Sequence, residues 1–207
     1  MTADGRWVVS IDARGHGCSE KPHDPALYGE ATMARDLVDL VDRLEVRSYD
    51  LVGYSMGGVV ALLAATGDVR VRRLVIGGLG AGAIEHGGVD RLTLPPSAVA
   101  AAMEAPDPAL ITEPMAQQMR LFADASGADR FALAAQARAV HGDPISFERI
   151  LSPTLVIAGE SDPLARSPEV LVQALPDARL QRVPGDHFGA LFAPSFCDSI
   201  VAFLRSD

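Results

Sequence analysis

Cysteine is scarce in this chain of 207 residues, which contains only Cys18 and Cys197. The two stand in unrelated contexts and lack the spacing of metal ligands, so the sequence indicates neither a disulfide framework nor a zinc site. This use of cysteine predicts a cytoplasmic protein. His23, His86 and His141 also lack the spacing of metal ligands.

Long apolar runs and basic clusters are missing as well. No stretch approaches about 18 uninterrupted apolar residues, and no cationic head precedes an apolar run at the N-terminus, so we expect neither a membrane span nor secretion. Eighteen basic side chains stand against 27 acidic ones, a net charge of −9, and no basic cluster is longer than Arg72-Arg73. This balance argues against nucleic acid or an anionic membrane as partner and favours a small neutral or hydrophobic substrate.

The pattern of elements predicts one domain with an insertion. Strand-like and helical stretches alternate from Trp7 to about Leu79, where residues 31–44 repeat apolar side chains at helical spacing, and they alternate again from residue 151. Between them lie alanine-rich helical pieces broken by prolines. We therefore expect an α/β core formed by residues 1–79 and 151–207 and a helical cap formed by residues 80–150.

The predicted cap carries large apolar side chains that could face an acyl or alkyl group bound beneath it. The alternative is that they form the core between the cap helices. These residues are Met115, Met119, Leu121, Phe122, Phe131 and Leu133.

A serine follows the apolar run at residues 49–52, in the pentapeptide Gly53-Tyr54-Ser55-Met56-Gly57, and a helix-like stretch follows it. This is the layout of a nucleophile elbow, a sharp strand-to-helix turn that exposes the serine hydroxyl. Glycines two places on either side suit such a turn because it leaves no room for Cβ atoms. The alternative is a glycine-rich turn whose serine only caps a helix.

A serine hydroxyl needs a base to take its proton, and the base needs an acid to fix its tautomer. The apolar run at residues 154–158 leads into a turn that carries Asp162, and the segment 178–183 leads into a loop that carries His187. Taken singly, Asp162 before a proline suits a turn and His187 suits an exposed loop. The carboxyl ends of parallel strands share one edge, however, so Ser55, Asp162 and His187 are predicted to meet there.

Four motifs in this order resemble the α/β-hydrolase family, specifically its small soluble members with a helical cap. They are the segments 12–19 (Asp-Ala-Arg-Gly-His-Gly-Cys-Ser), 53–57, 159–163 and 185–188. The resemblance implies an α/β fold of the α/β-hydrolase type, a mostly parallel sheet flanked by helices with an inserted helical cap. It also implies Ser55 as nucleophile, Asp162 as acid and His187 as base.

The resemblance departs from the family at the N-terminus. Relatives carry three strands and a His-Gly loop before the segment that corresponds to Asp12, whereas this chain begins almost at the fourth strand, predicted at Trp7–Ile11. The third strand of the family lies between the fourth and fifth, so we expect a gap inside the sheet. Three outcomes are open: an N-terminally truncated version of a longer parent, which we favour; a shift of Trp7–Ile11 onto Leu51-Val52; or a second molecule in the gap.

The same departure affects the oxyanion hole. The backbone N–H of Met56 supplies one donor, but the second donor of relatives comes from the loop that is missing here, so reduced activity is expected. The resemblance assigns Asp12 to bracing its loop, and His16 is expected to make a structural hydrogen bond.

These features predict a serine hydrolase for carboxylic esters, lactones or related acyl compounds, which requires no metal or organic cofactor. The alternative is a noncatalytic ligand-binding or interaction protein on the same truncated scaffold. The oligomeric state is open, and a homo-oligomer is one of the outcomes.

Overall fold

The computed structural model describes residues 5–206. In this part of the chain four strands form one parallel sheet, whose spatial order is that of the sequence. The strands are β1 (Tyr49–Tyr54), β2 (Val71–Gly77), β3 (Thr154–Gly159) and β4 (Ala178–Val183). β1, β3 and β4 confirm the strands expected at residues 49–52, 154–158 and 178–183.

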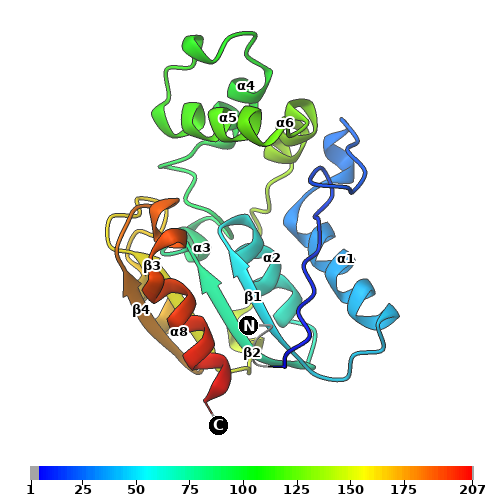
Figure 1. Ribbon diagram of the computed structural model, residues 1–207, viewed down its shortest axis with the longest axis vertical. Coiled ribbons are helices and arrows are strands. Elements are labelled where there is room, and N and C mark those ends of the chain that lie inside the picture. The colour runs from blue at the N-terminus through cyan, green and yellow to red at the C-terminus, as the bar shows by residue number, and fades with distance from the viewer. Residues whose placement is uncertain (1–4, 207) are drawn as a thin grey trace.

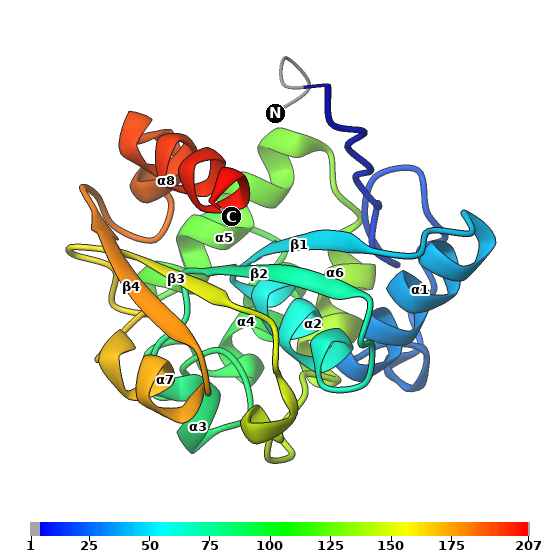
Figure 2. The same cartoon turned by 90° about the horizontal axis from the view of Figure 1, so that it is seen from below.

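Helices cover both faces of the sheet (Figures 1 and 2). On one face lie α1 (Glu30–Arg43), α2 (Met56–Ala65) and α7 (Pro168–Ala174), and on the other lies α8 (Pro194–Arg205). β3 is buried along its whole length, because it has a strand on each side and helices above and below. Such a position explains why its sequence is a continuous apolar run and does not alternate.

Two clusters of buried side chains hold these layers together. Leu62 of α2, Leu74 of β2 and Leu171 of α7 are fully buried in the cluster on one face. Ile157 of β3 and Phe203 of α8 belong to the cluster on the other. Burial of each such side chain contributes about 1.5–3 kcal/mol, so the packed layers fix where the strands end.

The helical insertion follows β2 and precedes β3. Its main helices are α4 (Pro96–Glu104), α5 (Pro114–Ser126) and α6 (Arg130–Arg138), preceded by the short α3 (Gly82–Glu85). Figure 1 shows α4, α5 and α6 beyond the carboxyl ends of the strands. Short 3-10 turns complete the chain at Pro25–Leu27, Pro108–Leu110, Phe147–Arg149 and Gly189–Phe192.

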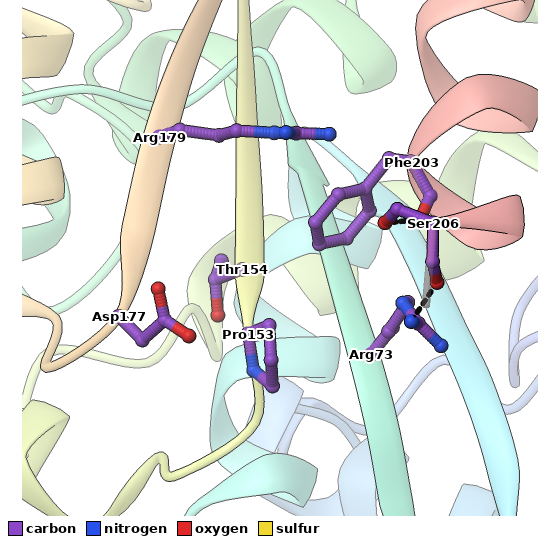
Figure 3. A pocket seen from close by; sticks show the side chains of 7 residues that line it. All are labelled: Arg73, Pro153, Thr154, Asp177, Arg179, Phe203 and Ser206. Atoms are coloured by element: carbon purple, nitrogen blue, oxygen red, sulfur yellow. Dashed lines mark hydrogen bonds between the residues drawn. The ribbon is translucent and has the colours of Figure 1, made fainter.

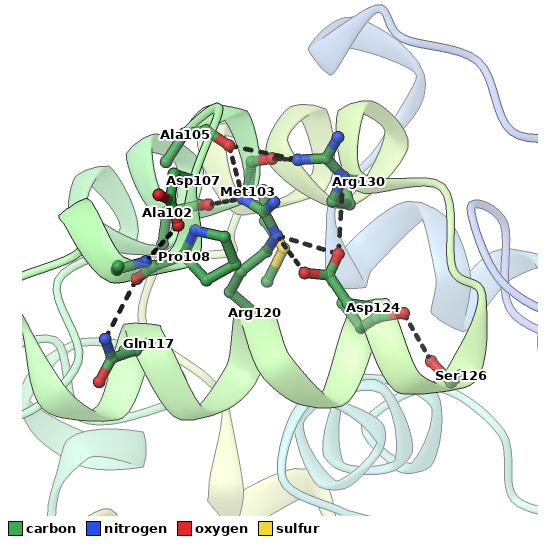
Figure 4. Close-up of polar contacts among 12 residues, drawn as sticks. Ala102, Met103, Ala105, Asp107, Pro108, Gln117, Arg120, Asp124, Ser126 and Arg130 are labelled. Carbon is green, nitrogen blue, oxygen red and sulfur yellow. Dashed lines mark hydrogen bonds and ion pairs between the residues drawn. The ribbon is translucent and has the colours of Figure 1, made fainter.

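A buried arginine braces this insertion (Figure 4). Arg120 of α5 is only 3% exposed. Its Nη1 donates to the carbonyl oxygens of Ala102 and Ala105, each at 2.7 Å, and its Nε pairs with Asp124 at 2.9 Å. The last carbonyls of a helix lack partners within it, so Arg120 satisfies the end of α4 and fixes α4 against α5.

The predicted first strand is wrong. Residues 6–13 form no strand or helix, and Trp7 is 71% exposed, with Val8, Val9 and Ile11 also exposed. A strand requires a hydrogen-bonded neighbour, and β1 pairs only with β2 among the described residues. The segment therefore does not shift onto Leu51-Val52. It runs extended beside the sheet (Figure 1), and the four strands of residues 5–206 form one continuous sheet with no position left open between them.

No helix among residues 5–206 is both long enough and apolar enough to cross a membrane.

Candidate active site

Ser55 sits in a strained turn between β1 and α2. Its dihedral angles are φ 53° and ψ −121°, a conformation that is uncommon for a residue with a side chain and that recurs at functional sites. The backbone N–H of Ser55 donates to the Gly77 carbonyl of β2 at 2.8 Å, which holds the turn against the sheet. The hydroxyl is thereby presented at the carboxyl end of β1, as the motif predicts.

The two elbow glycines have different roles. A Cβ atom on Gly53 would lie 2.1 Å from the carbonyl oxygen of Gly57, so the close approach of strand and helix does require glycine at residue 53. A Cβ atom on Gly57 would meet nothing within 4 Å, and its φ is not positive. The expectation that this turn leaves no room at Gly57 is wrong, because this residue is already the second of α2 and faces open space.

His187 connects Ser55 to Asp162 through two hydrogen bonds. The Ser55 Oγ and the His187 Nε2 are 2.9 Å apart, and so are the His187 Nδ1 and the Asp162 Oδ2. The Asp162 Oδ1 accepts from the backbone N–H groups of Leu164 and Ala165 at 2.9 and 3.3 Å. Asp162 and His187 are 6% and 5% exposed. The three residues that the sequence predicted to converge therefore lie in contact.

These bonds define the proton positions that the arrangement favours. A carboxylate only accepts hydrogen bonds, so the Nδ1 of His187 donates to Asp162 and its Nε2 is free to accept from the Ser55 hydroxyl. Asp186, although adjacent in sequence, is not part of this chain of bonds, because its Oδ1 accepts from the Gly189 N–H.

Two further residues position the histidine and were not found from the sequence. Tyr54 donates its hydroxyl to the His187 carbonyl oxygen, and its ring lies 5.2 Å from the imidazole. Burial raises the pKa of Tyr54, and Asp162 and Asp186 raise it further, so the phenol stays protonated as a donor. Gly78 has φ 69°, and a Cβ atom there would lie 2.9 Å from the His187 ring. In the sequence, Gly78 is marked only by its place in the glycine-rich segment 77–80 after β2.

The backbone N–H that follows Ser55 belongs to Met56. Met56 is the first residue of α2, so its N–H has no acceptor within the helix and lies at the positive end of the helix dipole. The loop before α1 lies nearby. There Asp12 accepts from the Cys18 N–H at 2.8 Å, and His16 Nδ1 lies 3.1 Å from the Arg14 carbonyl oxygen, the structural roles expected for both.

A cavity of about 280 Å³ opens above Ser55 and Met56, between the core and the helical insertion. Of the six apolar residues that could line a pocket or form the core of the cap, Met119, Phe122 and Leu133 line the cavity. Met115 packs in the core of the insertion instead, and Leu121 and Phe131 are about half exposed. At one border of the cavity the Phe122 ring lies 6.0 Å from that of Phe188, so the insertion and the histidine loop meet there.

Four polar side chains stand out in the wall of this cavity, namely His16, Glu30, Arg91 and His141. Glu30 is 3% exposed and accepts from the His141 N–H at 2.6 Å and from the Gln136 amide at 3.4 Å. Burial raises the pKa of Glu30, although the hydrogen bond from the His141 N–H acts in the opposite direction. The carboxylate thus joins the start of α1 to the end of the insertion.

A second cavity, of about 220 Å³, lies at the opposite ends of the strands. Figure 3 shows Arg73 of β2, Thr154 of β3 and Arg179 of β4 around it. It is separated from Ser55 by the length of the sheet. Within residues 5–206 no cluster of three or more His, Cys, Asp or Glu side chains is arranged to hold a metal ion.

Comparison with known proteins now identifies the class of protein. The model of the alpha/beta hydrolase family matches residues 2–196, and the chain belongs to this family. Among solved structures, a hydrolase from Pseudomonas aeruginosa PA01 is 30% identical and superposes with a TM-score of 0.71. The match covers 94% of this chain and 78% of that one.

Curated relatives match over shorter stretches. The sn-1-specific diacylglycerol lipase ABHD11 of Danio rerio is 45% identical over 73 residues, which are 35% of this chain and 22% of the relative. The esterase YbfF of Escherichia coli (strain K12) is 41% identical over 70 residues, 33% of this chain and 26% of the relative. The matched stretches thus span only about a quarter of these relatives' length.

Proposed function

We propose that the protein is a serine hydrolase for carboxylic esters, lactones or related acyl compounds. The observation that carries the proposal is the continuous hydrogen-bonded chain from Ser55 through His187 to Asp162, with the serine in a strained turn beneath a largely apolar cavity. The similarity to an esterase and to a lipase supports the same reaction class.

In the proposed reaction the Ser55 Oγ attacks the acyl carbon while His187 Nε2 takes the hydroxyl proton. Asp162 holds the tautomer in which Nδ1 carries a proton and stabilises the imidazolium that forms. The negative charge on the former carbonyl oxygen develops beside the Met56 N–H, the donor assigned to the oxyanion. His187 then returns its proton to the departing alcohol. A water molecule next attacks the acyl-enzyme while His187 Nε2 takes its proton, and His187 gives that proton back to Ser55 Oγ as the acid leaves.

The helical insertion, residues 80–150, is proposed to act as the lid that selects the acyl group. Met119, Phe122 and Leu133 would bury the acyl chain, and a wall of this kind favours small-molecule substrates. The chemistry needs no metal or organic cofactor. Cys18 and Cys197 are free and exposed, which supports the cytoplasmic location predicted from the sequence.

Labelling with a fluorophosphonate probe tests the proposal. The wild-type protein should form a covalent adduct at Ser55, and Ser55→Ala should remain unlabelled although it folds with the same circular dichroism spectrum. Ser199→Ala is the matched control, because this serine lies on α8, where its hydroxyl bonds to the Ser195 carbonyl. A folded wild-type protein that fails to react would refute the proposal and favour a noncatalytic binding protein.

A further inference from the structure

The polar side chains in the wall of the cavity have hydrogen-bonding capacity that the fold does not use. His141 lines the cavity, and its Nε2 is buried without a hydrogen-bond partner among the described residues. A buried polar atom without a partner costs about 1–3 kcal/mol, so a bound molecule that pairs with it removes a penalty present in the empty protein.

Arg91 lines the same cavity and is equally underused. Its Nη2 donates to the backbone carbonyls of Val140 and His141, while its Nε and Nη1 have no acceptor among the described residues. No carboxylate lies within ion-pair distance of it in residues 5–206, although the protein carries a net charge of −9. Most arginines of this chain do form such pairs, as Arg120 and Arg138 illustrate.

Glu30 forms no ion pair with the side chain of Arg91 or of His141. Both of its carboxylate oxygens are occupied, one by the His141 N–H and the other by the Gln136 amide, so it belongs to the frame of the cavity. It is also the only acidic side chain among the described residues that line the cavity. Arg91 and His141 both act electrostatically on Glu30, but the Nε and Nη1 of Arg91 keep N–H groups that an anion bound in the cavity can occupy.

We infer that the cavity binds acyl compounds that carry a second, free carboxylate, held by Arg91 and by the Nε2–H of His141. The inference rests on the proposed function and extends it to a substrate class: half-esters of dicarboxylic acids and comparable lactones. The apolar side chains of the insertion hold the chain between the two ends, and Ser55 acts on the esterified end. Arg91 lies before α4 and His141 lies after α6, on the segments that join the main helices of the insertion to the core, so both contribute to specificity from the base of the insertion.

Matched ester pairs test this inference. Mono-p-nitrophenyl adipate and p-nitrophenyl hexanoate differ only in the terminal carboxylate, and the glutarate/pentanoate and suberate/octanoate pairs vary the distance from Ser55. At the best length, kcat/KM should favour the carboxylate ester, and Arg91→Met should lower the ratio of the two kcat/KM values about 10-fold or more, the usual effect of a charge-assisted hydrogen bond. Arg91→Lys should restore part of the ratio.

Controls separate binding of the carboxylate from support of the insertion. Arg138→Met removes an arginine of α6 that is exposed and paired with Glu104, and it should leave the ratio unchanged. His141→Leu should lower the ratio in the same direction as Arg91→Met. Equal loss on both esters in Arg91→Met, or faster hydrolysis of the neutral ester at all three lengths, would overturn the inference.

A binding measurement keeps this inference distinct from the proposed reaction. Ser55→Ala protein, titrated calorimetrically with monomethyl adipate and with methyl hexanoate, should bind the former about 10-fold tighter or more, and Arg91→Met should abolish the difference. If no ester is hydrolysed but this preference is found, the proposed reaction fails while the carboxylate site stands. Equal affinities would refute the site whatever the activity.

Discussion

Replacing Gly53 by alanine gives the sharpest test of the turn that presents Ser55. The added Cβ would lie 2.1 Å from the Gly57 carbonyl oxygen and 2.9 Å from the Gly58 Cα. Both are backbone atoms of α2, so no side chain can rotate to make room, and the helix start must move by on the order of 1 Å away from β1. Overpacking of a well-packed site typically costs about 1–3 kcal/mol, and a clash with backbone belongs at the upper end.

The same movement would displace Ser55 and the Met56 N–H. A misplacement on the order of 1 Å can reduce a rate about 100-fold, so Gly53→Ala should react with a fluorophosphonate at least that much more slowly. Gly57→Ala is the matched variant in the same motif. It meets no atom within 4 Å and replaces glycine in a helix, so it should be neutral or stabilising by up to about 1 kcal/mol.

Urea unfolding followed by circular dichroism measures the two free energies, and Gly67→Ala, also in open space, is the surface control. The expected difference in the free energy of unfolding between Gly53→Ala and Gly57→Ala is about 3 kcal/mol or more. Equal unfolding midpoints for these two variants, or labelling of Gly53→Ala at the wild-type rate, would refute the description of this turn.

Three further predictions follow from side chains described above. Asp162→Asn should lower kcat on the order of 10,000-fold through loss of the correct imidazole tautomer; a loss below about 10-fold, measured with p-nitrophenyl hexanoate, would contradict this role. Arg120→Met should lower the free energy of unfolding by about 1–3 kcal/mol. The Asp124 side chain is 37% exposed, so Asp124→Ala should lower it by less than about 1 kcal/mol. Urea unfolding compares the two variants, and a larger loss in Asp124→Ala would contradict the role of Arg120 in holding α4 against α5. Burial raises the pKa of Glu30, so the folded state retains a proton that the unfolded chain releases and stability falls as pH rises from the unfolded value of about 4.3 through the folded one. Glu30→Gln should therefore gain melting temperature relative to wild type between about pH 4 and pH 7; a constant difference across this range would exclude the effect.

The sequence predicted the meeting of Ser55, Asp162 and His187 because each follows its own predicted strand. Parallel strands bring such positions to one edge, and the structure has them in hydrogen-bonding contact; their catalytic role stays a prediction. The positions of the strands and their parallel order were sufficient to predict this contact, because neither requires knowledge of how other side chains pack.

Other features depend on neighbours that a single sequence does not specify. The segment Trp7–Ile11 has the composition of a strand, but a strand exists only where a partner accepts its hydrogen bonds. Gly57 matches the motif as well as Gly53 does, yet only coordinates reveal which Cβ would meet backbone. Glu30, Arg91 and His141 are far apart in the chain, and no local pattern places them in one cavity wall.

The uncovered side of β1 has a consequence for how the molecule behaves at high concentration. Its outward N–H and C=O groups offer a template on which an extended stretch of another polypeptide can dock, and the half-exposed Val52 makes the strip attractive to apolar residues. Charged side chains lie at one end of this strip and oppose such docking: Asp50 pairs with Arg6 and Arg72, each at 2.6 Å. Burial alone would raise the pKa of Asp50, but Arg72 and Arg6 hold it below its usual value. The two ion pairs therefore persist in mildly acidic buffer, and they weaken when added salt screens the charges.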